Sequence, residues 1–402
     1  MSTIVKAATA ADFLAVVPRL VGFEPAESIV FVAFRGRRTC GAMRFDLPEH
    51  VAPPVARARS AGADDTERKF HRRVATTLVG TLSKLPGVDA MVPVVYTGEA
   101  FADAGRAPLA AFVRQVTERL EFSGFLVRDA LCVAADGWGS YLDPDCPPGG
   151  RPLDAIARSR VFDDLPPDQR GPLEGVADRA ALPAAGLLEC ERVAILLRRF
   201  RAVIDRDPTG QAPCFDPPGR VHPAVRAIGA IGAPWPRSSD IPLTLERILR
   251  HEPTSLDPVV AAFVITMVRS PAMRDVVMLQ WAFDLATGER VLSDARRFAA
   301  GAPADELDSA VLMLGQGPRP DPARVETAIT LLKRVAALAP ARDRPPVLCM
   351  LAWLNWALGR SSVANAFVCA AEDIDADYGL AEVMRVVLER GMLPEWAFAD
   401  EG

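Results

Sequence analysis

The apolar run from Ile29 to Phe34 constrains the fold more than any other part of this sequence. It has the length of one strand and lacks the alternation of a half-exposed strand, so it predicts a strand that is buried on both faces. Directly before it, apolar residues from Ala10 to Leu20 have helical spacing, and Gly22 suits the left-handed end of a helix. The opening stretch therefore predicts a helix followed by a fully buried strand.

The following residues continue an α/β pattern. Gly41 to Leu47 alternates between apolar and polar side chains, which predicts a hairpin partner for the first strand. Asp136 and Gly137 have the composition of a two-residue hairpin turn. Pro93 has no N–H to donate, so its strand is expected at an edge of the sheet or to begin at the proline. Further strands are predicted at 91–96, 127–134 and 138–142, and helices at 70–85 and 109–120.

Together these elements predict an N-terminal mixed sheet in the order β-β-α-β-α-β-β, with helices packed on it, in a domain of residues 1–142. Residues 143–190 are rich in Pro, Gly and Asp and are interpreted as a linker or long loop. Residues 191–402 show only helical patterns, which gives the fold class α/β plus all-α. Helices in this second domain are predicted near 193–204, 243–250, 258–269, 273–285 and 306–314.

The most regular helical pattern lies in residues 324–392. A helix around Val325 to Ala336 ends at Pro340, and two further helices pair around Gly359. Their small and aromatic residues resemble a tetratricopeptide unit, namely Trp353, Ala357, Gly359, Ala364, Phe367, Ala371 and Tyr378. A stable solenoid usually needs about three such repeats, and this stretch holds barely two. We therefore expect tetratricopeptide-like helical hairpins and not a true array.

Charge and cysteine content exclude several classes of protein. The chain carries 46 basic residues, nearly all arginine, against 51 acidic ones, for a net charge of −5. Arginine binds phosphate well, but this acidic balance argues against nucleic-acid binding, which remains a weak alternative. Seven cysteines without a C-x-x-C pair form neither a disulfide framework nor a zinc ribbon. The longest mainly apolar run, Val259 to Val268, is about half the ~20 residues of a membrane span, so we expect a cytoplasmic protein.

Five acidic residues are candidates for a catalytic site. Glu24 and Glu27 stand beside Ser28 at the turn into the first strand, where they form either a carboxylate pair or a solvated turn. A nuclease of the ribonuclease H type needs a metal-binding carboxylate on its first core strand, and 29–34 has none. No nucleotide-binding glycine motif is present, so no cofactor is expected. The enzyme alternative is a carboxylate or divalent-metal hydrolase using Glu24, Glu27, Asp46, Asp143 and Asp145.

The aromatic and sulfur side chains offer weaker candidates. The segment from Trp138 to Gly150 contains Tyr141 and Cys146 and is interpreted as a structured loop or an interaction site. Trp353 and Trp356 are three residues apart on a helix and are either core residues or part of a binding surface. No metal is expected, because the four histidines have no ligand spacing; they are His50, His71, His222 and His251.

Three segments together resemble the domain of unknown function 4192 family, an uncharacterised bacterial family common in actinobacteria. They are V-P-R-L-V-G-F-E-P-A-E-S-I-V-F-V-A-F with the following R-F-D-L-P, then W-G-S-Y-L-D-P-D-C-P-P-G-G-R-P-L, and L-A-W-L-N-W-A-L-G-R-S-S-V-A-N-A-F. Family members often carry a histidine where this chain has Glu24, and a cysteine pair where Asp145 precedes Cys146. The resemblance implies no established activity.

We expect a non-catalytic, cytoplasmic protein-interaction or scaffold protein. Its C-terminal helices would dock a protein partner or mediate self-association, because helical hairpins with exposed grooves commonly serve that role. The hydrolase is the alternative reading, and arginine-mediated nucleic-acid binding is the weaker one.

Overall fold

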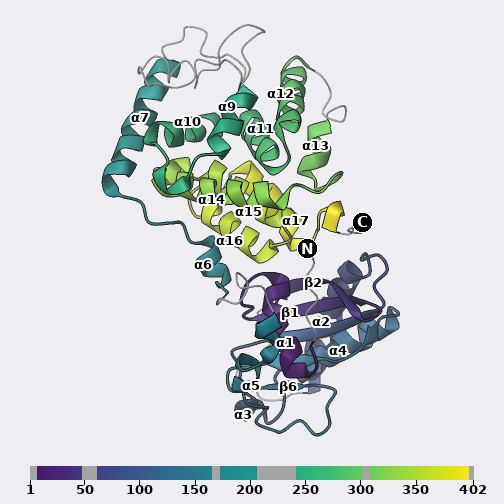
Figure 1. Ribbon diagram of the computed structural model, residues 1–402. Coiled ribbons are helices and arrows are strands. Elements are labelled where there is room, and N and C mark those ends of the chain that lie inside the picture. The colour runs from purple at the N-terminus through teal and green to yellow at the C-terminus, as the bar shows by residue number, and fades with distance from the viewer. Residues whose placement is uncertain (1–6, 48–60, 165–172, 206–240, 302–307, 398–402) are drawn as a thin grey trace. The chain divides into compact units, whose positions relative to one another are not determined.

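The computed structural model describes residues 7–47, 61–164, 173–205, 241–301 and 308–397. The chain forms two compact units, Met1–Arg179 and Ala180–Gly402 (Figure 1). The first is built on a mixed sheet with helices, and the second is helical, so the predicted fold class is confirmed. Within the described residues, every helix is too short or too polar to cross a membrane.

A six-stranded mixed sheet organises the first unit. The strands are β1 Ser28–Arg35, β2 Arg38–Asp46, β3 Ala90–Tyr96, β4 Leu126–Val127, β5 Leu131–Val133 and β6 Trp138–Ser140. Their spatial order is β2-β1-β3-β5-β6, and β4 also pairs with β3. β1 runs antiparallel to β2 and β3, whereas β3 runs parallel to β4 and β5. The hairpin turn predicted at Asp136 and Gly137 joins the antiparallel pair β5 and β6.

β1 is buried on both faces, as the apolar run predicts. Ile29, Phe31 and Ala33 point into one core, which α2 (Ala61–Leu82) and α4 (Ala110–Phe122) cover. The intervening residues Val30 and Val32 point into a second core under α1 (Ala10–Val21). Because successive side chains of a strand face opposite sides, only an unbroken apolar run satisfies both layers. The shorter helices of this unit are α3 Phe101–Ala104, α5 Asp154–Ala157, the 3₁₀ helix η1 Arg160–Asp164 and α6 Val176–Ala180.

The prediction that Pro93 places its strand at an edge is wrong, because β3 lies between β1 and β5. The carbonyl of Met91 accepts from the N–H of Arg128, so odd-numbered residues of β3 direct their backbone groups away from β1. On that side, β4 pairs with residues 90 and 91 and β5 with residues 94 to 96, which leaves Pro93 unpaired between them. Proline has no N–H, and at residue 93 this N–H would face the gap between β4 and β5. The sheet therefore loses no hydrogen bond between strands.

The strand predicted at 127–134 is also interrupted, and it forms β4 and β5 with a break at residues 128–130. Asp129 lies in this break, and its carboxylate accepts hydrogen bonds from the N–H of Ala130 at 2.8 Å and from the hydroxyl of Ser140 at 2.5 Å. An aspartate that bonds to nearby backbone competes with the strand ladder, which explains the interruption.

The second unit consists of helices. They are α7 Leu187–Asp205, α9 Ile241–Leu249, α10 Pro258–Met267, α11 Pro271–Ala282, α12 Leu285–Ala299, α13 Asp308–Met313, α14 Pro322–Leu338, α15 Pro345–Ala357, α16 Ser361–Glu372 and α17 Gly379–Glu389. Short 3₁₀ helices are η3 Pro253–Ser255, η5 Ala341–Asp343 and η6 Glu395–Ala397. Three helices begin with a capping side chain followed by proline, at Asp257, Ser270 and Asp321. The capping side chain accepts a hydrogen bond from an N–H group of the first turn that has no partner within the helix, and the proline fixes a helical φ angle at the start of that turn.

The helix predicted at 273–285 corresponds to α11, but it ends three residues earlier than predicted, and the helix that follows it was not predicted. α11 ends at Ala282, and the side chain of Asp284 caps a separate helix, α12, by accepting from the N–H of Thr287 at 2.7 Å. Gly288 permits α12 to approach α11, because a Cβ there would lie 2.2 Å from Oε1 of Gln280. The Asp284 cap is the sequence signal that marks this second helix.

The helices of the second unit follow a packing order. α7 packs against α10 and α14, α14 packs against α15, and α15 packs against α16 and α17. All thirteen residues of α15 are buried, as expected for a helix surrounded by others. The main neighbours of α7 are α10 and α14, and those of α17 are α15 and α16, so α7 and α17 stand at different ends of this order.

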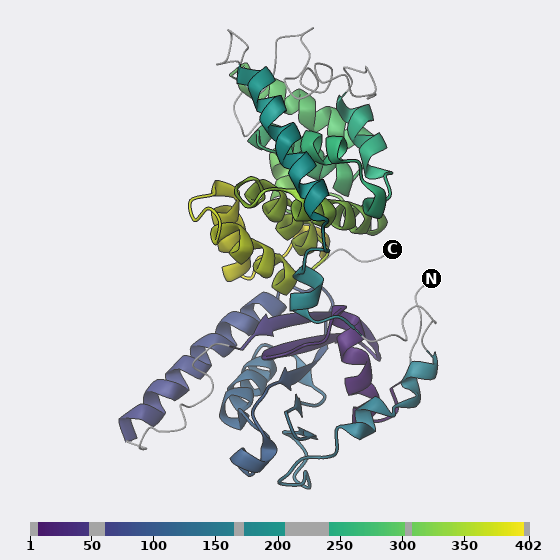
Figure 2. The ribbon, with the colours of Figure 1, turned by 90° about the vertical axis from the view of Figure 1, so that its left-hand side faces the viewer.

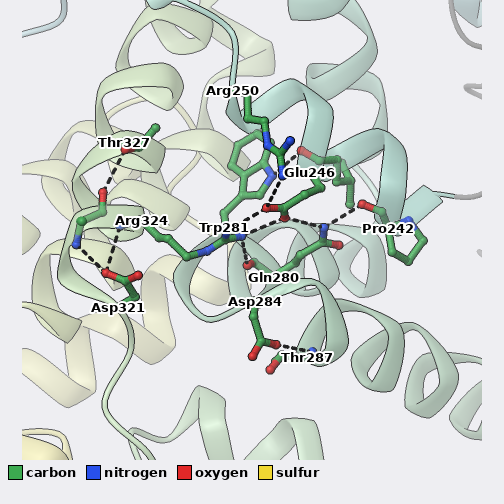
Figure 3. A network of polar contacts seen from close by, with 12 residues as sticks. Pro242, Glu246, Arg250, Gln280, Trp281, Asp284, Thr287, Asp321, Arg324 and Thr327 are labelled. Atoms are coloured by element: carbon green, nitrogen blue, oxygen red, sulfur yellow. Dashed lines mark hydrogen bonds and ion pairs between the residues drawn. The ribbon is translucent and has the colours of Figure 1, made fainter.

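An arginine clamp joins three of these helices (Figure 3). Arg324 of α14 donates from both terminal nitrogens to the carboxylate of Glu246 on α9, at 2.8 and 2.9 Å, and to the carbonyl of Gln280 on α11 at 3.1 Å. The side chain of Gln280 donates to the carbonyl of Pro242 at 2.7 Å. Hydrogen bonds from Arg324 hold the pKa of Glu246 below its usual value. This bidentate geometry is the strong form of a charged hydrogen bond.

Replacing Arg324 with alanine is expected to lower the free energy of unfolding by about 2–3 kcal/mol, since it leaves the partly buried Glu246 carboxylate without its partner. Arg250 provides the control, because it approaches the same carboxylate at 4.0 Å with a side chain that is 77% exposed. Arg250→Ala should cost less than about 0.5 kcal/mol. Urea denaturation of both variants tests the difference, and equal losses would contradict the assignment of the clamp to Arg324.

Candidate functional site

Two hydroxyl groups lie unsatisfied at the end of the sheet where β1 begins and β3 ends. Ser28 and Tyr96 are paired across these strands, and both are buried. Tyr96 belongs to the core under α1, and strand alternation places Ser28 on the same face. Neither hydroxyl has a hydrogen-bond partner in the described part of the chain. Buried polar groups are usually bonded, so this sheet end is a candidate site.

Three glutamates surround this position. Oε1 of Glu27 accepts from the N–H of Gly98 at 2.5 Å, and Glu27 has a φ of 40°, which is unusual for a residue other than glycine. Burial raises the pKa of Glu99, and the charge of Glu27 adds to this effect. Partial burial also raises the pKa of Glu24, against the opposing attraction of Arg19. The structure therefore brings Glu99, which the sequence prediction did not include, close to the predicted Glu27.

The other predicted acids have separate partners. Asp46 forms an ion pair with Arg44, whose guanidinium also donates to the carbonyl of Ala26 at 3.0 Å. Asp143 binds Arg151 at 2.5 Å and accepts from the N–H of Asp145 at 2.9 Å. Among the residues that the structure describes, no group of three or more His, Cys, Asp or Glu side chains is placed to hold a metal ion. The five predicted acids thus do not converge on one metal-binding group.

Hydrogen bonds from two aromatic side chains fix the loop from Trp138 to Gly150 to neighbouring segments. The indole of Trp138 donates to the carbonyl of Pro152 at 3.1 Å, and the hydroxyl of Tyr141 donates to the carbonyl of Pro108 at 2.6 Å. Cys146 packs over Gly139, where a Cβ would lie 2.5 Å from its Sγ. On the same side of this hairpin, burial raises the pKa of Cys132 to about 12, so its thiol stays protonated at neutral pH. These residues serve the packing of the loop.

Trp353 and Trp356 are interior residues and do not form an exposed binding surface. Their side chains are only 1% and 2% exposed. The Trp353 indole donates to the carbonyl of Met313 at 2.9 Å, and the Trp356 indole donates to the carbonyl of Met392 at 2.7 Å. Both tryptophans therefore tie α15 to neighbouring segments of the helical unit.

The four histidines do not form a site in the described residues. His71 is buried against Phe112, with ring centres 5.6 Å apart, and burial lowers its pKa. His251 is exposed, whereas His50 and His222 lie outside the described residues.

An exposed apolar face lies on α17, in the region where the sequence predicts partner binding. Leu380, Ala381 and Met384 bury the inner side of this helix. Val383 and Val386 lie away from that side and are 52% and 40% exposed. Residues three apart on a helix are neighbours, so the two valines form one small surface, which we call the α17 face. The sequence prediction did not single them out, because a Val in an amphipathic helix is usually a core residue.

The charge around the α17 face is negative. Residues 372–390 contain six acidic side chains and two arginines. One of these arginines, Arg385, forms an ion pair with Glu372. The other five acids are exposed, namely Asp373, Asp375, Asp377, Glu382 and Glu389.

Replacing Glu99 with glutamine tests the electrostatics of the sheet end. The folded-state pKa of Glu99 lies above its unfolded value, so its ionisation favours the unfolded state as the pH rises. Glu99→Gln should therefore raise the melting temperature at pH 7, and the gain should disappear below the unfolded pKa of about 4.5. Thermal unfolding followed by circular dichroism across this range measures the effect, and a gain that does not change with pH would contradict it.

The family comparison covers both units. The family model described as a domain of unknown function (DUF4192) matches residues 11–162 and 237–395, which is more than half of the chain. No curated protein and no solved structure matches the chain.

Proposed function

The chain belongs to the domain of unknown function 4192 family, and from this premise we propose that it is a non-catalytic scaffold whose helical unit docks a protein partner on the α17 face. The proposed location is the cytoplasm. The observation that carries the proposal is the exposure of Val383 and Val386 on the outer side of a helix that ends a packing order.

Single exposed aliphatic side chains are common on protein surfaces, so exposure alone is weak support. Here the two valines are neighbours on one helix, and α17 packs on α15, which is buried along its whole length. A rigid helix that presents adjacent apolar side chains resembles the helix-and-groove surfaces that bind amphipathic segments. The tetratricopeptide-like residue pattern of 324–392 supports the same reading.

The charge of the residues around the α17 face indicates the chemistry of its partner. With five exposed acids and one unpaired arginine, Arg390, the surroundings of the α17 face carry a net negative charge. Opposite potentials across an interface speed association and exclude wrong partners. The expected partner is therefore a basic amphipathic segment, with aliphatic side chains that cover the valines and Lys or Arg side chains that meet the acids.

The test measures the binding of two fluorescent model peptides to the full chain by anisotropy. One peptide has leucines at helical spacing with lysines on the other positions, and its control has glutamates in place of the lysines. We expect only the basic peptide to bind. Val383→Ser with Val386→Ser should weaken its binding about tenfold or more, because the apolar contact is lost.

The matched control is Val311→Ser on α13, where the valine is 44% exposed. This variant should bind the basic peptide like the unmodified chain. Equal binding of the acidic and basic peptides, or no effect of the two α17 substitutions, would contradict the proposal.

A hydrolase with its site at the sheet end is the second candidate. It is favoured by the raised pKa of Glu99 beside Glu27 and by the unsatisfied hydroxyls of Ser28 and Tyr96. Of its other predicted acids, Glu24 also lies at this sheet end, where its charge adds to the burial that raises the pKa of Tyr96. Asp46 pairs with Arg44, and Asp143 pairs with Arg151 and accepts from the N–H of Asp145. No group of three or more metal-binding side chains is found among the described residues. The test is the hydrolysis of chromogenic esters and phosphodiesters, measured with and without Mg²⁺ or Mn²⁺. Hydrolysis that is abolished by Glu27→Gln and by Glu99→Gln would establish the hydrolase in place of the scaffold.

Arginine-mediated nucleic-acid binding is less well supported. Several arginines are engaged by carboxylates within the fold, including Arg324 by Glu246, Arg334 by Glu189 and Arg385 by Glu372. Such side chains are not free to neutralise phosphates.

A further inference from the structure

A second apolar face lies at the other end of the helical packing order, on α7. The inner side of this helix buries Val193, Leu197 and Phe200 against its neighbours. Its first turn is fixed by Arg334 of α14, which donates to Glu189 at 2.6 Å. Figure 2 shows α7 in front of the helices on which it packs. The helix is therefore a firmly held outer member of the unit.

The outer side of α7 carries exposed aliphatic side chains. Leu187 and Leu188 are each 75% exposed, and Ile195 is 41% exposed. Leu188 and Ile195 are two helical turns apart and lie on one face, opposite the buried residues. We call these three side chains and the arginines beside them the α7 face.

The charge of the α7 face is positive. Arg192, Arg198 and Arg199 are exposed, and none of them forms an ion pair with a residue that the structure describes. Glu191, directly before Arg192, is the one exposed acid in residues 191–199, so this stretch has a net positive charge. The α7 face thus has the composition that the α17 face requires of its partner, aliphatic side chains flanked by arginines.

We propose that the α17 face binds the α7 face of a second copy of this chain. This inference rests on the proposed docking function of α17 and names its occupant. Two observations carry it: the faces lie at opposite ends of one packing order, and their charges are complementary. A contact between them continues the row of helices from one copy into the next.

Because the two faces lie at opposite ends of the packing order, each copy turns its α17 face to one neighbour and its α7 face to another, so the contact is heterologous. Contacts of this kind form rings or open chains and not a closed symmetric dimer. α7 lies between the two stretches that the family model matches, so this property belongs to the chain's own residues. The expected assembly grows with protein concentration and weakens with salt, because the Debye length falls to about 10 Å at 0.1 M salt.

Sedimentation velocity of the full chain tests the proposal at rising protein concentration. We expect species larger than a dimer at low salt and a shift toward the monomer at high salt. Arg198→Glu with Arg199→Glu reverses the charge of the α7 face. Glu382→Arg with Glu389→Arg replaces both acids of helix α17 itself, so that in either double variant α7 of one copy and helix α17 of the next carry charges of the same sign. Each double variant alone should therefore remain monomeric.

Combining the two double variants provides the decisive control. An equimolar mixture, or one chain with all four substitutions, should assemble again, since each reversed face then meets an opposite charge. All of the changed residues are exposed, and unchanged circular dichroism would confirm that the variants fold. A chain that stays monomeric at its highest soluble concentration, a closed dimer, or a mixture that does not reassemble would each overturn the proposal.

The peptide assay separates this inference from the proposed function. The α7 double variant should still bind the basic peptide, because its α17 face is unchanged. Peptide binding without self-association would overturn the inference and leave the docking function standing. Self-association that persists in Val383→Ser with Val386→Ser, together with absent peptide binding, would overturn both.

Discussion

In the packed helices of the second unit the central helix is wholly buried, whereas the helices at the two ends of the packing order each keep one side exposed, and the surface chemistry of these end helices follows from this difference. α15 is buried along its whole length, whereas α7 and α17 each bury one side. Arginines join members of this packing order to one another and to the helices beside it: Arg334 of α14 bonds Glu189 of α7, and Arg324 of α14 bonds Glu246 of α9. The aliphatic side chains on the outer sides of the two end helices are exposed in the folded chain. They remain available to another molecule, and we infer that this availability is their role.

The distribution of charge distinguishes these ends from ordinary surface. Arginine is abundant in this chain, but inside the helical unit it serves mainly as a clamp: Arg274 bonds the hydroxyl of Tyr378 at 3.0 Å, and Arg334 bonds Glu189. Among the described residues, no such pair is found for the arginines of the α7 face or for the five exposed acids around α17. The two faces carry charges of opposite sign beside their exposed aliphatic side chains. Such complementary charges favour association in one orientation over non-specific association.

The local sequence pattern predicted the helices and strands well, but it predicted less well which of them lie side by side in the fold. The buried strand β1 and the turn at Asp136 followed from residue types within a few positions. Pro93 misled the prediction, because its tolerance depends on a gap between β4 and β5 that no local pattern shows. Glu99 was missed because its proximity to Glu27 arises from the pairing of β1 with β3, in which Ser28 lies opposite Tyr96, 68 residues later in the chain (96 − 28). The exposed valines of α17 were missed because their spacing is the same as that of core residues.

The account is tested most directly by a disulfide trap between copies. In a background with the exposed Cys40 and Cys369 replaced by serine, one chain carries Ile195→Cys and the other Val386→Cys. After mild oxidation of the mixture, mass spectrometry identifies which cysteines are joined. The account predicts cross-links between position 195 of one copy and position 386 of the other. Cross-links that join only like positions, or no cross-link under conditions of assembly, would contradict it.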